Sequence, residues 1–306
     1  GNYSFWYESS QLAARQKAQS NKKAEEKKKE LQEFISRFSA NVAKSKQATS
    51  RKKMIEKLNI EEIKPSSRRY PGIIFELERE AGDQILNIEK LAFKFDGDLL
   101  FDKVNLNLSK SDKVIFISKD TRAVNNFFDI ISNRIKTFDG SFDWGITTRQ
   151  EYIPLNNDYL FNKPQSLVDW LRNYAITEEE KEEVYLRGFL GKMLFTGDEA
   201  LKNSNILSGG EKVRCMISKM MMSRSNVLII DEPTNHLDLE AITAFNNALI
   251  NFKGTLLFST TDHHFAQSLA NRVIELTPKG IIDRYLNFDE YMTDPKIKEL
   301  RKNMYL

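Results

Sequence analysis

The chain has 306 residues, of which 41% are hydrophobic and 29% are charged. This composition is typical of a globular protein, and the length allows one large α/β domain plus an appendage. No run of about eighteen apolar residues occurs, which excludes a predicted membrane-spanning helix and a membrane partner. The single cysteine, Cys215, excludes an internal disulfide framework, so we expect a cytoplasmic location.

Charge is distributed unevenly along the chain. Residues 11–69 contain 17 Lys and Arg against 7 Glu and no Asp, a net charge of +10, whereas the whole chain carries +3. The remaining residues are therefore net acidic, and a basic arm precedes an acidic body. Lys and Arg bind nucleic-acid phosphates with little regard to sequence, so RNA is one candidate partner of the arm. A solvated charged face is the other interpretation.

The arm has a strongly helical composition. Residues 11–39 contain no Pro or Gly, are rich in helix-forming residues, and place apolar positions at three- and four-residue steps. A polar break at 43–49 and a second amphipathic stretch at 50–58 predict an antiparallel helical hairpin, which Pro65 ends. The candidate RNA contacts are the cations at the predicted tip: Lys44, Lys46, Arg51, Lys52 and Lys53.

The body alternates strand-like and helix-like segments. Strands are predicted at 85–91, 99–108, 113–118, 227–230, 255–258 and 272–276, and helices at 126–131, within 167–201, after Lys212 and at 239–250. This alternation predicts an α/β fold in which helices cover both faces of a parallel sheet.

The strand at 113–118 and the helix after it frame a phosphate-binding loop that has lost its chemistry. The pattern requires Gly, four residues, Gly, Lys and Ser or Thr. Those positions hold Ser118, Ala123, Val124 and Asn125. The glycines that let a backbone approach phosphates are absent, and Val124 supplies no charge. An alternative is that Lys119 and Arg122 supply the charge from new positions, although Asp120 would repel a phosphate.

Two further motifs carry chemistry. Residues 207–212, LSGGEK, form a two-glycine turn that opens onto a helix, where the macrodipole and unpaired N–H groups favour an anion. The candidate anion-binding groups are Ser208 and the backbone amides of Gly209 and Gly210, and Glu211 is a further candidate site residue of the same turn. Downstream, the strand at 227–230 ends in Asp231 and Glu232, residue types that hold Mg²⁺ or act as a general base. The alternative interpretation of LSGGEK is a helix cap without a ligand.

LSGGEK, the run VLIIDEPTNHLD at 227–238 and the basic helical linker together resemble the ABC-F family. The linker sequence and the altered phosphate loop resemble the bacterial branch that includes YkpA and YbiT. The resemblance covers nearly all 306 residues. It implies an ABC-type nucleotide-binding domain, with a mixed sheet and a helical subdomain, that follows an antiparallel α-helical hairpin. Family members carry two ATP-binding cassettes, and residues 1–7, GNYSFWY, resemble the end of the first. We therefore expect the C-terminal half of such a protein: a linker at 1–83, the second cassette at 84–290 and a short tail at 291–306.

The resemblance also implies roles for particular residues. In the family, ATP and Mg²⁺ lie between the phosphate loop of one cassette and the LSGG turn of the other, so this turn would complete a site on a partner cassette. Asp231 would be a Mg²⁺ ligand and Glu232 a general base, and His236 and Asp238 would lie in a loop that crosses the interface. Leu155 takes the place of the family's glutamine and Thr261 that of its histidine. With the altered phosphate loop, these departures argue against hydrolysis at this cassette's own site.

Finally, the resemblance implies a partner. The family binds ribosomes, and its linker reaches toward tRNA, so rRNA and tRNA are expected to contact the basic hairpin of an ATP-gated translation factor. Its other partner would be the N-terminal cassette of the same protein. Two other functions stay open from sequence: the ATPase subunit of a membrane transporter, and a non-catalytic docking module.

Overall fold

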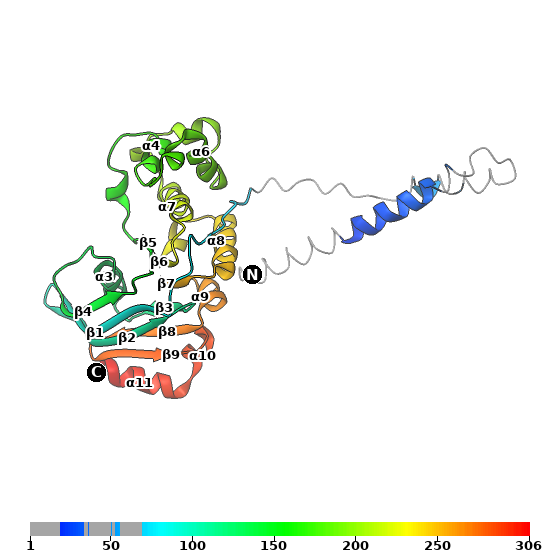
Figure 1. Cartoon of the computed structure of the whole chain (residues 1–306). Coiled ribbons are helices and arrows are strands. Elements are labelled where there is room, and N and C mark those ends of the chain that lie inside the picture. The colour runs from blue at the N-terminus through cyan, green and yellow to red at the C-terminus, as the bar shows by residue number, and fades with distance from the viewer. Residues whose placement is uncertain (1–18, 34–35, 37–49, 51–52, 56–68) are drawn as a thin grey trace. The chain divides into compact units, whose positions relative to one another are not determined.

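The computed structural model describes residues 19–33, 36, 50, 53–55 and 69–306, and the chain divides into two units after Arg68 (Figure 1). In the first unit, residues 19–33 and 53–55 are α-helical and Lys53 is exposed. The other predicted tip cations, Lys44, Lys46, Arg51 and Lys52, lie outside the described residues, as does the predicted break. In the parts of the chain that the structure describes, no helix is both long and apolar enough to cross a bilayer.

The second unit is built on two sheets. The strands are β1 (Gln84–Phe95), β2 (Asp98–Ser109), β3 (Lys113–Ile117), β4 (Asp139–Trp144), β5 (Gln150–Ile153), β6 (Val227–Asp231), β7 (Thr255–Ser259), β8 (Arg272–Thr277) and β9 (Gly280–Arg284). A three-stranded antiparallel sheet has the order β2-β1-β4, and a six-stranded sheet has the order β5-β6-β7-β3-β8-β9. In the larger sheet β9 runs antiparallel to β8, and the other neighbours pair in parallel. The predicted mixed sheet of an ABC-type domain is thus confirmed.

The prediction of a single parallel sheet was wrong for the first two strands. β1 and β2 pair antiparallel across a two-residue turn, in which Asp96 and Gly97 both have positive φ, at 49° and 91°. An Asp-Gly pair favours the tight turn whose twist matches that of a hairpin. The chain therefore reverses directly after β1 instead of crossing over through a helix.

The helices form a cover for the large sheet and a separate subdomain. They are α3 (Thr121–Ile131), α4 (Leu167–Arg172), α5 (Glu178–Lys181), α6 (Glu183–Lys192), α7 (Gly209–Ser223), α8 (Leu239–Asn251), α9 (His263–Leu269), α10 (Phe288–Thr293) and α11 (Pro295–Tyr305). Figure 1 shows α4 and α6 clustered away from the two sheets, with α7 leading back toward them. The predicted helical region within 167–201 is therefore the helical subdomain, broken into short helices.

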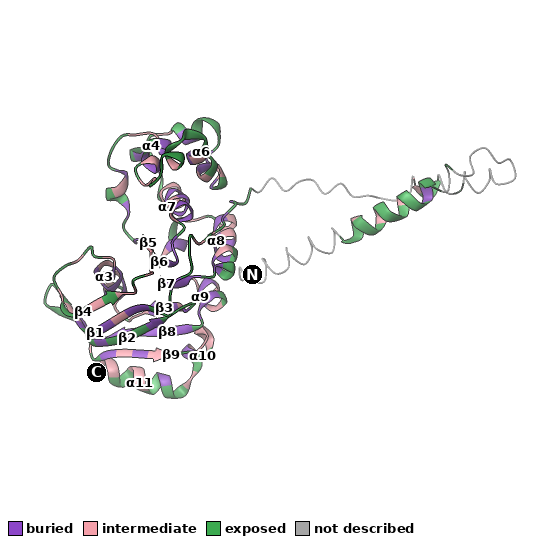
Figure 2. Cartoon of the chain, in the orientation of Figure 1, coloured by how far each residue is buried: buried purple, intermediate pink, exposed green. Residues whose placement is uncertain are grey.

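The buried side chains concentrate along the strands and on the inner faces of the helices (Figure 2). Phe116 of β3 stacks on Phe127 of α3, with ring centroids 4.9 Å apart, and meets Phe128 edge-on at 5.3 Å. These three rings are fully buried. Because aromatic pairs of this kind are strongly stabilising, the two elements that flank residues 118–120 are fixed to one another.

Residues 69–83, which the sequence analysis assigned to the linker, belong to the second unit. Ile73 is 8% exposed within the main hydrophobic core, and the Phe75 ring packs edge-on against Phe245 and Phe252 at 6.0 Å. The backbone N–H of Gly72 donates to the carbonyl of Lys192 at 2.7 Å. By packing, the second unit therefore begins before Gln84.

Residues 291–306, expected as a tail, also pack on the second unit. Glu275 of β8 is fully buried and accepts hydrogen bonds from the hydroxyls of Tyr291, at 2.7 Å, and Tyr305, at 2.9 Å. Arg301 of α11 pairs with the same carboxylate at 2.7 Å. A buried carboxylate requires partners of this kind, so the network fixes α10 and α11 to the large sheet.

The neighbouring residues Ile73 and Ile74 provide a matched test of this packing. Ile73→Ala should lower the free energy of unfolding by about 2–5 kcal/mol, because it leaves a cavity in the core. Ile74 is 60% exposed, so Ile74→Ala should change the same quantity by less than about 0.5 kcal/mol. Urea unfolding of the full chain, followed by tryptophan fluorescence, measures both. Equal effects would show that residues 69–83 do not pack as described.

Candidate functional site

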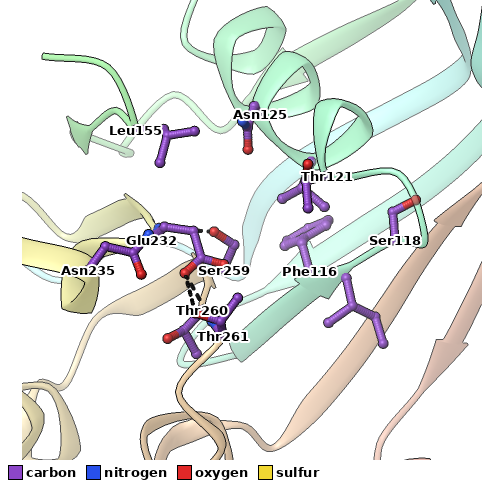
Figure 3. Close-up of a pocket in the computed structure, with 12 residues that line it drawn as sticks. Phe116, Ser118, Thr121, Asn125, Leu155, Glu232, Asn235, Ser259, Thr260 and Thr261 are labelled. Carbon is purple, nitrogen blue, oxygen red and sulfur yellow. Dashed lines mark hydrogen bonds between the residues drawn. The ribbon is translucent and has the colours of Figure 1, made fainter.

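The sheet topology brings three predicted site segments to one edge of the large sheet: the altered phosphate loop after β3, the carboxylates at the end of β6, and Thr261 after β7. β6, β7 and β3 are neighbours and run in parallel, so the residues after their carboxyl ends meet there. They line a cavity of about 310 Å³. The lining residues are Phe116, Ile117, Ser118, Thr121, Val124, Asn125, Leu155, Glu232, Asn235, Ser259, Thr260 and Thr261 (Figure 3). Ser118, Val124, Asn125, Leu155, Glu232 and Thr261 were all predicted site residues, and the structure places them together.

The altered phosphate loop is capped by its own chain. Asp120 is the N-cap of α3, and its Oδ1 accepts a hydrogen bond from the Arg122 N–H at 3.0 Å. A carboxylate therefore lies at the end of α3 where the macrodipole favours an anion. Ala123 and Val124, which take the places of Gly and Lys, are 0% and 4% exposed. Their side chains fill the hydrophobic core under the helix.

Both cations of the loop are bound to other groups. The Arg122 guanidinium pairs with Asp120 at 2.7 Å and with Asp98, at the start of β2, at 2.9 Å. The hydrogen bonds to Asp120 and Asp98 raise the pKa of Arg122. The Lys119 ammonium lies over the Tyr305 ring, 4.1 Å from its centroid, and the Lys119 N–H donates to the Tyr305 hydroxyl at 2.9 Å. The interpretation in which these two residues supply the missing charge therefore requires them to leave existing partners.

Asp231 ends β6 as a buried carboxylate with two partners from this chain. The Ser259 hydroxyl donates to Oδ1 at 2.6 Å. The Asn125 side chain, with its nitrogen facing the acceptors, donates to Oδ2 at 3.2 Å. Burial raises the pKa of Asp231 to about 7; the Ser259 hydroxyl opposes this rise, and the charges of Glu232 and Asp129 add to it. Both oxygens of Asp231 are therefore hydrogen-bonded within the chain, and burial disfavours its ionised form.

Glu232 is held by the residue that replaces the expected histidine. Thr261 donates to Oε2 through its N–H at 2.9 Å and through its hydroxyl at 3.2 Å (Figure 3). The backbone of Glu232 is left-handed, with φ 47° and ψ 51°, and its N–H donates to the Ser259 hydroxyl at 3.0 Å. Burial raises the pKa of Glu232, against the two hydrogen bonds from Thr261. A non-glycine residue in this conformation costs energy, so the surrounding contacts must hold it in place.

The cavity offers Mg²⁺ fewer protein donors than the family resemblance implies. Mg²⁺ is held by one or two carboxylates together with hydroxyls, waters and phosphate oxygens in near-octahedral geometry. Here Asn125 and Leu155 stand at two of the positions that the family resemblance assigns to metal ligands, and Leu155 is 42% exposed at the cavity. Among the residues that the structure describes, no group of three or more His, Cys, Asp and Glu could hold a metal ion. The protein donors at the cavity are the carboxylates of Asp231 and Glu232 and the Asn125 side chain.

The LSGGEK turn has the geometry of a well-capped helix start. Ser208 is the exposed N-cap of α7 and forms a capping box with Glu211, whose Oε2 accepts from the Ser208 N–H and hydroxyl, each at 2.8 Å. Lys202 pairs with the same carboxylate at 2.7 Å. Burial acts to raise the pKa of Glu211, but the hydrogen bonds from Lys202 and Ser208 lower it to about 2. The carboxylate at this helix start is therefore neutralised by a cation.

The two glycines of the turn are required by the loop after β6. That loop is a 3-10 turn, η5 (Pro233–His236). A Cβ on Gly210 would lie 2.4 Å from the His236 carbonyl oxygen, and one on Gly209 would lie 3.1 Å from the His236 ring. His236 therefore packs against the signature turn of its own chain. Asp238 is exposed and caps α8, accepting from the Ala241 N–H at 2.8 Å.

Sequence reasoning missed Ser259, Thr260 and Tyr305 at this site. Ser259 and Thr260 follow the predicted strand at 255–258, where their position beside β6 was a usable signal. Tyr305 gave none, because it reaches the loop from the far end of the chain. Cys215 is fully buried, and burial raises the pKa of its thiol, as expected of a residue that fills the core.

Comparison with known proteins finds relatives among ATP-binding cassette proteins. Two family models, both described as ABC transporter, match residues 1–75 and 102–235. The ABC transporter ATP-binding protein YkpA of Bacillus subtilis is 51% identical over 100% of this chain and 56% of its own length. YbiT of Escherichia coli O157:H7, named as a probable ATP-binding protein, is 36% identical over 97% of this chain and 56% of its own length. ABC transporter F family member 2 of Arabidopsis thaliana is 29% identical over 92% of this chain and 42% of its own length.

Solved structures support the fold. The ATP-binding cassette MJ0796, in a dimeric post-hydrolysis state with ADP and Pi, superposes with a TM-score of 0.54 at 16% identity, over 66% of this chain and 99% of its own. MJ1267, a cassette of an ABC transporter in its ADP conformation, gives 0.54 at 15% identity, over 72% and 99%. The chain spans about half the length of the curated relatives it matches. By its motifs, its fold and these relatives, the chain belongs to the ABC-F family of ATP-binding cassette proteins.

Proposed function

We propose that the chain is the C-terminal half of an ABC-F ATPase and lends its signature turn to a nucleotide held by another cassette. Its own cavity binds Mg-ATP weakly or not at all. Ser208, Gly209, Gly210 and Glu211 take the nucleotide-facing role in trans, with the loop that holds His236 and Asp238 at the same interface. ATP and Mg²⁺ are then shared with the N-terminal cassette, and Glu232 is catalytically silent.

One observation carries this proposal: both cations of the phosphate loop are bound inside the chain. Arg122 is held by Asp98 and Asp120, and Lys119 by Tyr305. A triphosphate at the cavity would meet the carboxylate of Glu232, and the residues that line the cavity include no Lys or Arg to offset it. At the signature turn, the carboxylate of Glu211 is paired with Lys202.

We also propose a ribosomal partner and a cytoplasmic translation role. The support is the net charge of +10 on residues 11–69, which suits binding to RNA phosphates. The contacts proposed are Lys44, Lys46, Arg51, Lys52 and Lys53. In this scheme ATP closes the paired cassettes, and hydrolysis at the other site releases the ribosome.

Restoring the lysine should restore part of the nucleotide site. The chain is expected to bind Mg-ATP with a Kd above about 1 mM, since the loop lacks the contacts that make such sites tight. Val124→Lys, made with Ser118→Gly, Ala123→Gly and Asn125→Ser, should tighten binding by at least about tenfold, as one charged hydrogen bond contributes roughly 1.5–3 kcal/mol. Calorimetry measures both.

The matched control carries methionine at position 124 in the same background, which keeps side-chain length without charge, and should gain nothing. Micromolar binding by the unmodified chain, abolished by Arg122→Ala, would show instead that Arg122 leaves its partners and holds a phosphate.

The trans role can be tested in the two-cassette protein with Ser208→Arg. The bulky cation at the signature turn should lower the ATPase rate at least about tenfold, because the turn can no longer close on a nucleotide. Ser166 provides the control, since it caps α4 in the same way, accepting from the Asp169 N–H at 3.0 Å. Ser166→Arg loses a similar cap, worth about 1 kcal/mol, and should leave the rate within about twofold. An unchanged rate in Ser208→Arg would favour a docking module.

Ribosome binding should depend on the arm and on salt. Replacing Lys44, Lys46, Arg51, Lys52 and Lys53 with Gln should weaken co-sedimentation with ribosomes, and the loss should be greatest at low salt, where phosphate contacts contribute most. Sedimentation at two salt concentrations measures the effect. Undiminished co-sedimentation of the variant would remove the arm from the proposal.

A further inference from the structure

A second pocket lies at the edge of the large sheet opposite the nucleotide cavity. Arg149 precedes the amino end of β5, and Asn226 precedes the amino end of β6. Together with residues 78–79 and Arg224, they line a cavity of about 230 Å³. We call this set, Glu78, Arg79, Arg149, Arg224 and Asn226, the arginine pocket. It contains three guanidinium groups and one carboxylate.

The floor of the arginine pocket is a buried amide that fixes the backbones around it. Asn226 is 2% exposed. Its side-chain nitrogen donates to the carbonyls of Arg79, at 3.2 Å, and Thr147, at 3.0 Å, and its oxygen accepts from the Arg149 N–H at 2.8 Å. The Glu78 N–H donates to the Arg224 carbonyl at 3.0 Å. The backbone at all three arginines is therefore fixed by hydrogen bonds, and their side chains extend from it.

The three arginine side chains differ in their hydrogen-bond and ion-pair partners. Arg149 pairs with Glu78. Arg224 donates to the Tyr185 hydroxyl at 3.2 Å, a neutral partner. Arg79 is exposed, and within the described ranges its guanidinium has no hydrogen bond or ion pair. One carboxylate against three guanidinium groups leaves the pocket with a net charge of +2.

Arg224 occupies a position that favours glycine. It is the C-cap of α7, and its backbone is left-handed, with φ 49° and ψ 32°. Glycine or asparagine adopts this conformation at lower cost, so another residue there is strained. A cation at a helix end does interact well with the macrodipole. That interaction needs no partner pocket, however, whereas this side chain lines one with two other arginines.

We propose that the arginine pocket binds a phosphate of the RNA backbone that the basic arm contacts. This inference rests on the proposed function. Arginine suits the role because its planar fork donates two parallel hydrogen bonds to phosphate oxygens.

The test uses the full chain and a fluorescently labelled single-stranded polyuridine oligomer, titrated at several salt concentrations. Arg79→Gln with Arg224→Gln should weaken binding roughly tenfold, from the loss of charged hydrogen bonds to one phosphate. The slope of log K against log salt should fall by about 0.7, the value for one phosphate contact on a single strand. Lys296→Gln with Lys298→Gln removes the same charge from exposed sites on α11 and should change affinity less than about twofold.

Glu78→Gln provides a test of opposite sign. It removes the competing carboxylate and frees Arg149, so RNA should bind more tightly, by about threefold or more. A purely structural role for the Arg149–Glu78 pair predicts a lower melting temperature and no gain in affinity. Thermal unfolding by circular dichroism checks that every variant is folded.

The outcomes separate the pocket from the arm. If the unmodified chain binds RNA through the arm, and the Arg79 and Arg224 variant binds equally well with the same salt slope, the pocket assignment is overturned and the arm proposal stands. If neutralising the arm also has no effect, the proposed RNA partner fails as well. A third experiment titrates the chain with inorganic phosphate. Millimolar phosphate binding that requires Arg79, with unchanged RNA affinity, would make this a small-anion site and overturn the RNA assignment.

Discussion

The site depends on how the chain satisfies two acidic side chains at the end of β6. Asp231 is 2% exposed, and burying a charged or polar group without partners costs several kcal/mol. Ser259 and Asn125 supply donors to Asp231, and Thr261 supplies two donors to Glu232. Both carboxylates therefore have hydrogen-bond partners within the chain.

The N-termini of α3 and α7 are capped by different chemical groups. At α3 the cap is the carboxylate of Asp120, so the positive end of the dipole already faces an anion from the same chain. At α7 the cap is the hydroxyl of Ser208, and the nearby carboxylate of Glu211 is neutralised by Lys202. Each of these carboxylates has a cation beside it, Arg122 at α3 and Lys202 at α7, so the two helix starts differ in the group at the cap. A carboxylate occupies the cap of α3 and a hydroxyl that of α7, and this difference supports the proposal that the cassette contributes to a shared site through its signature turn.

Much of the candidate site could be predicted from local sequence motifs, but the contacts between residues far apart in the sequence could not. The loop at 118–125, the carboxylates after β6 and the LSGG turn were each identified because their chemistry depends on spacing within a few residues. The partners that complete them come from elsewhere: Asp98 reaches Arg122 from the start of β2, and Tyr305 reaches Lys119 from α11. The hydrophobic periodicity of a sequence does not predict such contacts. The Asp96-Gly97 turn, in contrast, was readable and would have predicted the antiparallel hairpin.

A chain of contacts connects Glu232 at the cavity with the signature turn. Glu232 begins the η5 turn in a left-handed conformation, held by Thr261. Within that turn the Thr234 hydroxyl bonds the hydroxyl of Thr260 at 3.2 Å, and the last residue, His236, packs directly on Gly209 and Gly210. A change at Glu232 would therefore shift the backbone on which the signature glycines rest. Because a Cβ on Gly210 would clash with the His236 carbonyl oxygen, the geometry of the signature turn is set partly by the loop that Glu232 begins.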